Sequence, residues 1–297
     1  MTITLNEGEI SLMIAPDRGA EVRSLRASGV ELLYRPPWAP APLLPGPLTA
    51  DAWERAWHGG WQLLWPNAGV PCTVNGVQQG FHGAGSVAPF SVIESDGRSA
   101  SLQCERDGLF CERCYEVDGG RVRATARISN RSERSIPLIT VEHLVLGGHL
   151  AAAGTAIGLD GGWLVEQTWD GTPLPPGGGW PWLGGEDFSV LPDRTSRFAV
   201  VQGVLAGTAR IAGAEGVTLE LSFDRTAYPH LWLWEERFAA AVAPWDGRGE
   251  CLAIEPASVP STDGLAAAIA RGEATVLAPG DERSSWIELR PGEGRLE

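Results

Sequence analysis

Short runs in which apolar and polar residues alternate recur along most of the chain, and they constrain its fold more than any other feature. Near the start, Ile10, Leu12 and Ile14 would share one face of an extended chain, because successive side chains of a strand point to opposite sides. Similar runs follow at intervals of about 8–12 residues, bounded by glycine, asparagine or aspartate, as in the strands of a sandwich. We expect strands at residues 3–5, 10–14, 22–25, 30–33, 91–94, 100–105, 110–117, 121–129, 198–204, 217–223, 230–235, 250–254 and 285–289.

Helical patterns are confined to two short segments. Residues 51–57 place two tryptophans four apart, on one face of a helix. Residues 264–271 form the second segment, with Thr262 or Asp263 as the expected N-cap and Gly272 as the stop.

Two stretches rich in proline and glycine, residues 36–50 and 171–187, are predicted to be irregular loops. No change of composition resembles a linker, and no segment repeats. A chain of 297 residues is long for one domain, but all-β sandwiches of this length occur. We therefore predict an all-β fold in which residues 1–297 form a single large β-sandwich with one or two short helices.

The net charge of −14 and the absence of lysine exclude several kinds of chemistry, because all 23 basic residues are arginine. Without lysine the chain can form no Schiff base and no phosphate-binding loop of the lysine type. An acidic chain is poorly suited to nucleic acid or to an anionic membrane, and charged side chains interrupt the longest weakly polar stretch, residues 135–165. We expect no nucleic-acid or membrane partner, no secretory leader and a cytoplasmic location.

The five cysteines cannot all form disulfides with one another, since their number is odd. Cys111 and Cys114 form a lone pair with no histidine cluster nearby, so a zinc site is not expected. Residues three apart on a strand point to opposite faces. We expect free thiols in a reducing compartment, and neither a metal nor a cofactor.

Three ionisable side chains are candidates for moving protons at neutral pH. Glu255 ends an apolar strand just before a proline, where partial desolvation would raise the pKa of a carboxyl group and suit it to act as a base. His143 lies within another apolar strand, and His82 precedes a glycine in a segment typical of a loop. Each also has an ordinary explanation: an edge carboxylate bonded to a backbone N–H, a buried neutral histidine and a surface histidine.

Taken together, these residues make the chain similar to the aldose 1-epimerase (galactose mutarotase-like) family. That family carries a His-Gly pair in its first third, a second histidine in a strand near the middle and a catalytic glutamate before a proline near the end. His82, His143 and Glu255 occur here in the same order and with the same neighbours. The similarity extends to both ends of the chain and therefore covers nearly all of it.

The resemblance implies a role for each of the three residues. Glu255 would be the general base that takes the proton of the anomeric hydroxyl, and His143 the general acid that protonates the ring oxygen, so that the C1–O5 bond opens. His82 would help to hold the ring oxygen or a neighbouring hydroxyl. The rate should follow a bell-shaped pH profile, with an acidic limb from the carboxylate and a basic limb from His143. A neighbouring carboxylate raises the pKa of a histidine and desolvation lowers it, and the sequence leaves open which effect wins.

The chain departs from the family where sugar hydroxyls are bound. Galactose mutarotases carry an arginine near an asparagine upstream of the first histidine; here Asn67 is present, but no arginine occurs between Arg55 and Arg98. Their Asp-His pair has its nearest counterpart in Asp193, which an arginine follows. Trp234 lies in an alternating run and could form a wall on which a sugar stacks. We expect Asn67, Asp193 and Trp234 to bind substrate, and a neutral sugar to be preferred over its 6-phosphate.

The function expected on these grounds is the interconversion of the α and β anomers of a neutral aldose, with the small-molecule sugar as partner and a homodimer left open. The alternative is a catalytically silent carbohydrate-binding or regulatory protein on the same scaffold, because folds host many functions. A third hypothesis is a metal-dependent enzyme in which His82, His143 and Glu255 form a two-histidine, one-carboxylate set, although the usual H-x-H spacing is missing.

Overall fold

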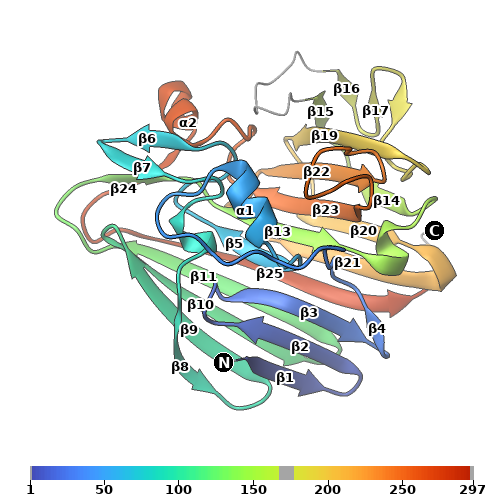
Figure 1. Cartoon of the computed structure of the whole chain (residues 1–297), viewed down its shortest axis with the longest axis horizontal. Coiled ribbons are helices and arrows are strands. Elements are labelled where there is room, and N and C mark those ends of the chain that lie inside the picture. The colour runs from blue at the N-terminus through green and yellow to red at the C-terminus, as the bar shows by residue number, and fades with distance from the viewer. Residues whose placement is uncertain (1, 167–176, 295–297) are drawn as a thin grey trace.

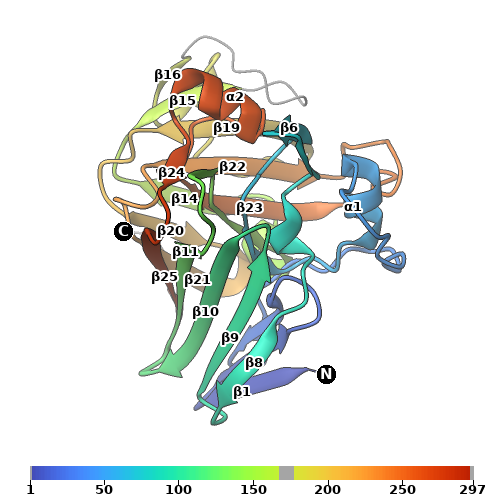
Figure 2. The same ribbon diagram turned by 90° about the vertical axis from the view of Figure 1, so that its left-hand side faces the viewer.

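Two large antiparallel sheets face each other in the computed structural model of the chain, which describes residues 2–166 and 177–294 (Figure 1). Helices α1 (Ala50–Ala56) and α2 (Leu265–Arg271) lie outside the strands (Figure 2). The all-β sandwich with short helices that the sequence predicted is therefore confirmed.

The larger sheet has eleven strands within the described residues, in the order β1-β2-β3-β5-β13-β23-β22-β19-β15-β16, with β4 paired to β3. These strands are β1 (Ile3–Glu7), β2 (Ile10–Ala15), β3 (Glu21–Ala27), β4 (Val30–Glu31), β5 (Trp61–Leu64), β13 (Val141–Leu146), β15 (Trp163–Glu166), β16 (Gly178–Gly179), β19 (Thr195–Gln202), β22 (His230–Arg237) and β23 (Glu250–Ala257).

The smaller sheet has eight strands in the same part of the chain, in the order β14-β20-β21-β25-β11-β10-β9-β8. They are β8 (Ser91–Ser95), β9 (Ser99–Arg106), β10 (Leu109–Asp118), β11 (Arg121–Asn130), β14 (Ala156–Leu159), β20 (Thr208–Ala212), β21 (Val217–Phe223) and β25 (Glu282–Glu293). Three two-stranded ribbons complete the described strands: β6 (Cys72–Val74) with β7 (Val77–Gln79), β12 (Ile136–Leu138) with β24 (Thr275–Leu277), and β17 (Trp182–Leu183) with β18 (Glu186–Asp187).

The predicted elements differ from the observed ones mainly at their ends and in the second glycine-rich stretch. The strand expected at 30–33 is only the two-residue β4. Of the loop expected at 171–187, residues 171–176 lie outside the described residues, and 177–187 contain the short strands β16, β17 and β18. Helix α2 begins after Gly264 without a side-chain cap from its own N-terminus, so the expected capping by Thr262 or Asp263 is wrong.

The interior between the sheets is a hydrophobic core that takes side chains from both. Leu144 of β13, Leu233 of β22 and Ile254 of β23 belong to it together with Leu221 and Ile287 of the smaller sheet, and all five are fully buried. Burial of one such side chain stabilises the fold by about 1.5–3 kcal/mol. Because strands alternate, the residues between these on β13, β22 and β23 point to the outer face of the larger sheet.

The cysteines are all free thiols. Cys111 is buried and Cys114 is partly exposed, as expected for residues on opposite faces of β10. Among the described residues no helix has the length and apolar character needed to cross a membrane.

Candidate functional site

Three central strands bring the candidate catalytic residues together on the outer face of the larger sheet. Val145 of β13 pairs with Ala253 of β23 in an antiparallel ladder. His143 lies two residues before Val145 and Glu255 two residues after Ala253, so these two residues lie side by side. Trp232 of β22 pairs with Glu255 from the other side. Strand pairing thus brings His143 and Glu255 together although they are far apart in the sequence.

This face is the floor of a cavity of about 550 Å³, a size suited to a small ligand. Helix α1, the loop that carries His82 and the loop after β22 contribute its walls. Seven of the lining residues are tryptophan or phenylalanine: Trp53, Trp57, Phe81, Phe198, Trp232, Trp234 and Trp245. The ionisable groups among the described lining residues are all histidine or glutamate, with no arginine: Glu54, His82, His143, Glu236 and Glu255.

Glu255 and His143 are almost completely buried, with 2 % and 3 % of their surfaces exposed. Glu255 Oε2 and His143 Nδ1 have no hydrogen-bond partner within the described part of the chain. Burial raises the pKa of Glu255 well above its ordinary value and lowers the pKa of His143 to about 3. For His143, desolvation therefore outweighs the effect of the neighbouring carboxyl group, a balance that the sequence left open. Both His143 and Glu255 favour their neutral forms.

His82 reaches the same cavity from a tight loop. Its Nδ1 accepts a hydrogen bond from the backbone N–H of Gly69 (3.2 Å), so in the neutral ring Nε2 carries the proton and can donate it to a ligand. The ring centroid lies 5.1 Å from that of His143, and burial lowers the pKa of His82 well below its ordinary value. Gly83 has a φ of 73°, and a Cβ there would lie 2.4 Å from the carbonyl oxygen of Trp65, which explains the glycine after the histidine.

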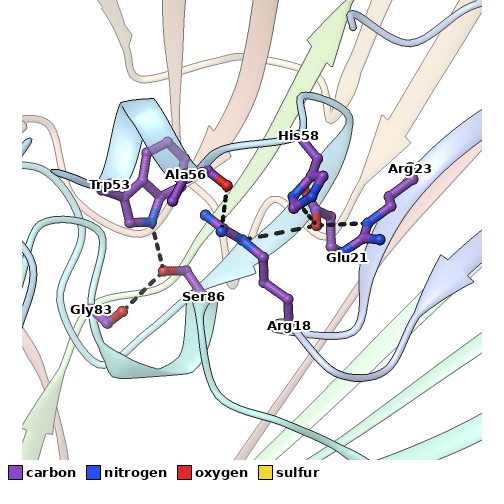
Figure 3. A network of polar contacts seen from close by, with 8 residues as sticks. All are labelled: Arg18, Glu21, Arg23, Trp53, Ala56, His58, Gly83 and Ser86. Atoms are coloured by element: carbon purple, nitrogen blue, oxygen red, sulfur yellow. Dashed lines mark hydrogen bonds and ion pairs between the residues drawn. The ribbon is translucent and has the colours of Figure 1, made fainter. Parts of the chain in front are cut away.

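A chain of hydrogen bonds fixes helix α1 to this loop (Figure 3). Trp53 Nε1 donates to Ser86 Oγ (3.1 Å), and Ser86 Oγ donates to the carbonyl oxygen of Gly83 (3.0 Å). At the other end of the helix, Arg18 Nη1 donates to the carbonyl oxygen of Ala56 (2.5 Å). The tryptophan wall and the loop of the first histidine are therefore positioned as one unit.

Asn67 is not brought to the cavity lining, contrary to expectation. The side chain is fully buried, and its Nδ2 donates to the carbonyl oxygens of Val70 (3.0 Å) and Gly80 (2.9 Å). Its Oδ1 accepts the N–H of Leu265 at the start of α2 (2.7 Å). Both ends of the amide are used inside the protein, so Asn67 holds the loops around the site instead of facing a ligand.

Of the remaining two predicted binding residues, only Trp234 lines the cavity. Asp193 is exposed in the connection between β18 and β19 and is not part of the cavity lining, so the structure does not bring it to the other site residues. Trp234 does line the cavity, and its Nε1 has no partner among the described residues. Its ring lies edge-on to Trp245 with centroids 5.2 Å apart, whereas the indole of Trp232 is held by a bond to the carbonyl oxygen of Val259.

Sequence reasoning missed two carboxyl groups of the cavity, Glu54 and Glu236. Glu236 follows Trp232 and Trp234 at period two on β22, so extending that alternation by one step would have found it. Glu54 lies between the two tryptophans of α1, whose spacing predicted a helix but gave no sign that the helix covers a cavity.

No group of three or more histidine, cysteine, aspartate or glutamate side chains in residues 2–166 and 177–294 could hold a metal ion. The described residues therefore do not form the two-histidine, one-carboxylate metal site of the third hypothesis.

Solved structures share this fold, although no protein-family model and no curated protein matches the chain. A protein from Synechocystis sp. PCC 6803 is 18% identical with a TM-score of 0.74, covering 99% of this chain and 96% of that one. A provisionally named aldose 1-epimerase from Escherichia coli K12 is 16% identical with a TM-score of 0.72, covering 99% of both chains. A galactose mutarotase-like protein from Lactobacillus casei is 15% identical with a TM-score of 0.68, covering 98% of this chain and all (100%) of that one. The chain therefore has the galactose mutarotase-like sandwich fold, and at these identities the likeness extends to the fold alone.

Proposed function

We propose that the protein interconverts the α and β anomers of an aldose by acid–base opening of the sugar ring. The observation that carries this proposal is the placement of His143 beside Glu255 on the floor of an aromatic cavity, where each has a polar atom without a hydrogen-bond partner among the described residues. A buried polar group without a partner costs about 1–3 kcal/mol, which bound sugar hydroxyls would offset. The names of two similar structures, a provisionally named aldose 1-epimerase and a galactose mutarotase-like protein, support the same function.

Ring opening needs an acid and a base with one transferable proton between them. Glu255 and His143 together carry one such proton. A protonated Glu255 beside a neutral His143 carries as many protons as a carboxylate beside an imidazolium. When the proton passes from Glu255 to His143 as the sugar binds, Glu255 can take the proton of O1 while His143 protonates O5 and the C1–O5 bond breaks. The aldehyde rotates about C1–C2, and the ring closes to the other anomer as the two proton transfers reverse.

The other side chains of the cavity would bind and orient the sugar. His82 Nε2 has a proton to donate to the ring oxygen or to a neighbouring hydroxyl. Trp234 offers an apolar ring face and an N–H that has no acceptor in the described part of the chain, a combination that suits a sugar ring. A phosphate group would meet carboxyl groups and no arginine among the described lining residues, so we propose a sugar without phosphate, in line with the expected neutral aldose.

A panel of anomerically pure aldoses, followed by polarimetry or saturation-transfer NMR, tests this function. The protein should accelerate the approach to anomeric equilibrium for at least one unphosphorylated aldose, and glucose 6-phosphate should be a poorer substrate than glucose. Binding of sugars without any acceleration would instead support the catalytically silent carbohydrate-binding protein. A faster reaction of the 6-phosphate would contradict the proposed substrate class.

A further inference from the structure

One end of the cavity contains two carboxyl groups that the ring-opening chemistry does not use. Glu236 lies on β22 four residue pairs along from the pair that contains Glu255, since Trp232 pairs with Glu255 and Glu236 pairs with Cys251. Four residues of a strand span roughly 13 Å, so Glu236 lies well away from the place of C1 beside Glu255. Glu54 approaches the same end from helix α1.

Glu236 is held rigidly, yet one of its oxygens is unused. Its Oε1 accepts the backbone N–H groups of Ala239 (2.8 Å) and Ala240 (2.9 Å). Its Oε2 has no partner within the described residues, although only 1 % of the side-chain surface is exposed. A buried carboxyl oxygen that lines a cavity without a donor is a binding group for a ligand that carries donors.

Tryptophan rings surround these carboxyl groups. Trp245 Nε1 donates to Glu54 Oε2 (3.1 Å), which orients the indole in the cavity wall. The ring centroids of Trp57 and Trp234 lie 6.3 Å and 5.2 Å from that of Trp245. Aromatic faces attract cations, and the attraction grows to about 2 kcal/mol where water is excluded.

Within residues 2–166 and 177–294, no arginine forms an ion pair with Glu54 or Glu236. None of the described residues that line the cavity is an arginine, and the chain has no lysine. The nearby cations are committed elsewhere: Arg55 pairs with Asp51 on the exposed side of α1, and Arg248 pairs with Asp246. The carboxyl groups and the tryptophan faces thus remain available to a cation supplied by a ligand.

We propose that this end of the cavity binds an ammonium group, so that the preferred ligand is an aldose with a charged amino group remote from C1. The ammonium would donate to Glu236 Oε2 and lie against the tryptophan faces, while C1 and O5 lie between Glu255 and His143. The placement of C1 rests on the proposed function, but recognition of the ammonium does not.

Calorimetry with three ligands that differ only at C6 tests the proposal: glucose, 6-amino-6-deoxyglucose and its N-acetylated form, which keeps the nitrogen and loses the charge. At pH 6.5 the amino sugar should bind about tenfold more tightly than either neutral ligand, the usual worth of a charge-assisted hydrogen bond. Glu236→Gln should bring this affinity ratio close to one. The glutamine keeps an oxygen for the two backbone N–H groups and replaces the charged Oε2 by an amide.

Two controls make the outcome decisive. Glu94→Gln removes the same charge from an exposed site on β8 and should leave the affinity ratio unchanged. If Glu236→Gln does not fold, Glu54→Gln, which keeps an acceptor for Trp245, should lower the ratio instead. Equal affinities for the three ligands in the unmodified protein would overturn the proposal, and so would a preference that survives both cavity substitutions.

The same binding data separate this inference from the proposed function. A preference for the amino sugar without anomerisation of any aldose would support the ammonium site and contradict the proposed enzymatic function. Anomerisation of glucose without that preference would do the reverse.

Discussion

Strand β13 places two neighbouring residues in opposite environments. The contrast distinguishes a residue that stabilises the fold from one that faces the cavity. Glu142 points into the core between the sheets, where its oxygens accept from Arg113 Nη1 (2.6 Å) and Nη2 (2.7 Å) and from Trp61 Nε1 (2.7 Å). His143 points the other way and meets Glu255 on the cavity floor, where Glu255 Oε2 and His143 Nδ1 have no partner among the described residues.

Both carboxyl groups are buried to the same degree, so burial alone does not tell them apart. Glu142 is fully buried and Glu255 is 2 % exposed. Glu142 has its hydrogen bonds and its countercharge within the fold, as a structural ion pair requires. Among the described residues Glu255 Oε2 has no hydrogen-bond partner and no salt bridge involves Glu255, and such a group persists in a fold where a ligand or a reaction uses it.

The largest expected effect is on stability and comes from the core side. Arg113→Met leaves the Glu142 carboxylate buried without its countercharge, and we expect the free energy of unfolding to fall by about 3–5 kcal/mol. Urea denaturation measures the loss. Arg127→Met, which removes an exposed arginine paired with Glu112, should cost less than about 1 kcal/mol. A loss as small for Arg113→Met as for Arg127→Met would show that the buried pair is not structural.

On the cavity side, substitutions of the two histidines should lower the rate to different extents. His143→Asn should lower the rate of anomerisation by about 10²–10⁴-fold, the usual contribution of a positioned acid. His82→Asn should leave a higher residual rate, because in the proposed mechanism His82 only orients the sugar. The partly exposed His149 provides a control, and His149→Asn should have no effect on NMR saturation-transfer rates. A greater loss for His82→Asn than for His143→Asn would exchange the two roles.

The pH dependence should differ from the one expected from the sequence. The pH profile of kcat/KM reports the pKa values of the free enzyme. Because burial lowers the pKa of His143 to about 3 and raises that of Glu255, the acidic limb should belong to the imidazole and the basic limb to the carboxyl group. Nitrogen-15 NMR of the ring should show a neutral His143 at pH 5. An imidazolium signal at that pH would restore the order that the sequence suggested.

The smallest expected effect concerns the wall of the cavity. Trp234→Leu removes a stacking surface and an N–H donor, so KM should rise about 3–10-fold, equivalent to about 0.5–1.5 kcal/mol, with kcat little changed. Trp182→Leu replaces an exposed tryptophan outside the cavity lining and should leave KM as it is. Steady-state polarimetry over a range of sugar concentrations separates the two parameters.

The sequence was sufficient for the fold because alternation is a local property. The run from Ile10 to Ile14 shows its two faces directly in the order of residues, whereas β23 is buried on both faces and continues past Glu255, the residue expected at its end, to Ala257. The ends of elements depended on distant partners, as at α2, where the acceptor for the first N–H comes from Asn67. The prediction that residues 1–297 form one domain stays a prediction, although a core shared by both sheets favours it.

The candidate site was predictable only in part, for a physical reason. His82, His143 and Glu255 were named from their neighbours, and the structure brings all three to one cavity. The structure does not place Asn67 in the cavity lining. A sequence does not show whether the hydrogen bonds of a side-chain amide are already taken by the backbone. The protonation of His143 was equally beyond reach, since it depends on how much water the folded cavity excludes.

The central claim is that Glu255 is retained for chemistry at a cost to stability, and one variant tests both halves. Burial raises the pKa of Glu255 in the folded state, so its stabilising contribution is complete below the unfolded pKa of about 4.3 and is lost as the pH rises above it. Glu255→Gln does not titrate and should therefore be more stable than the unmodified protein at pH 7 and 8, with little difference near pH 4.5. The rate of anomerisation of the same variant should fall by about 10²–10⁴-fold. A variant that keeps the full rate, or that loses stability at pH 8, would contradict the account.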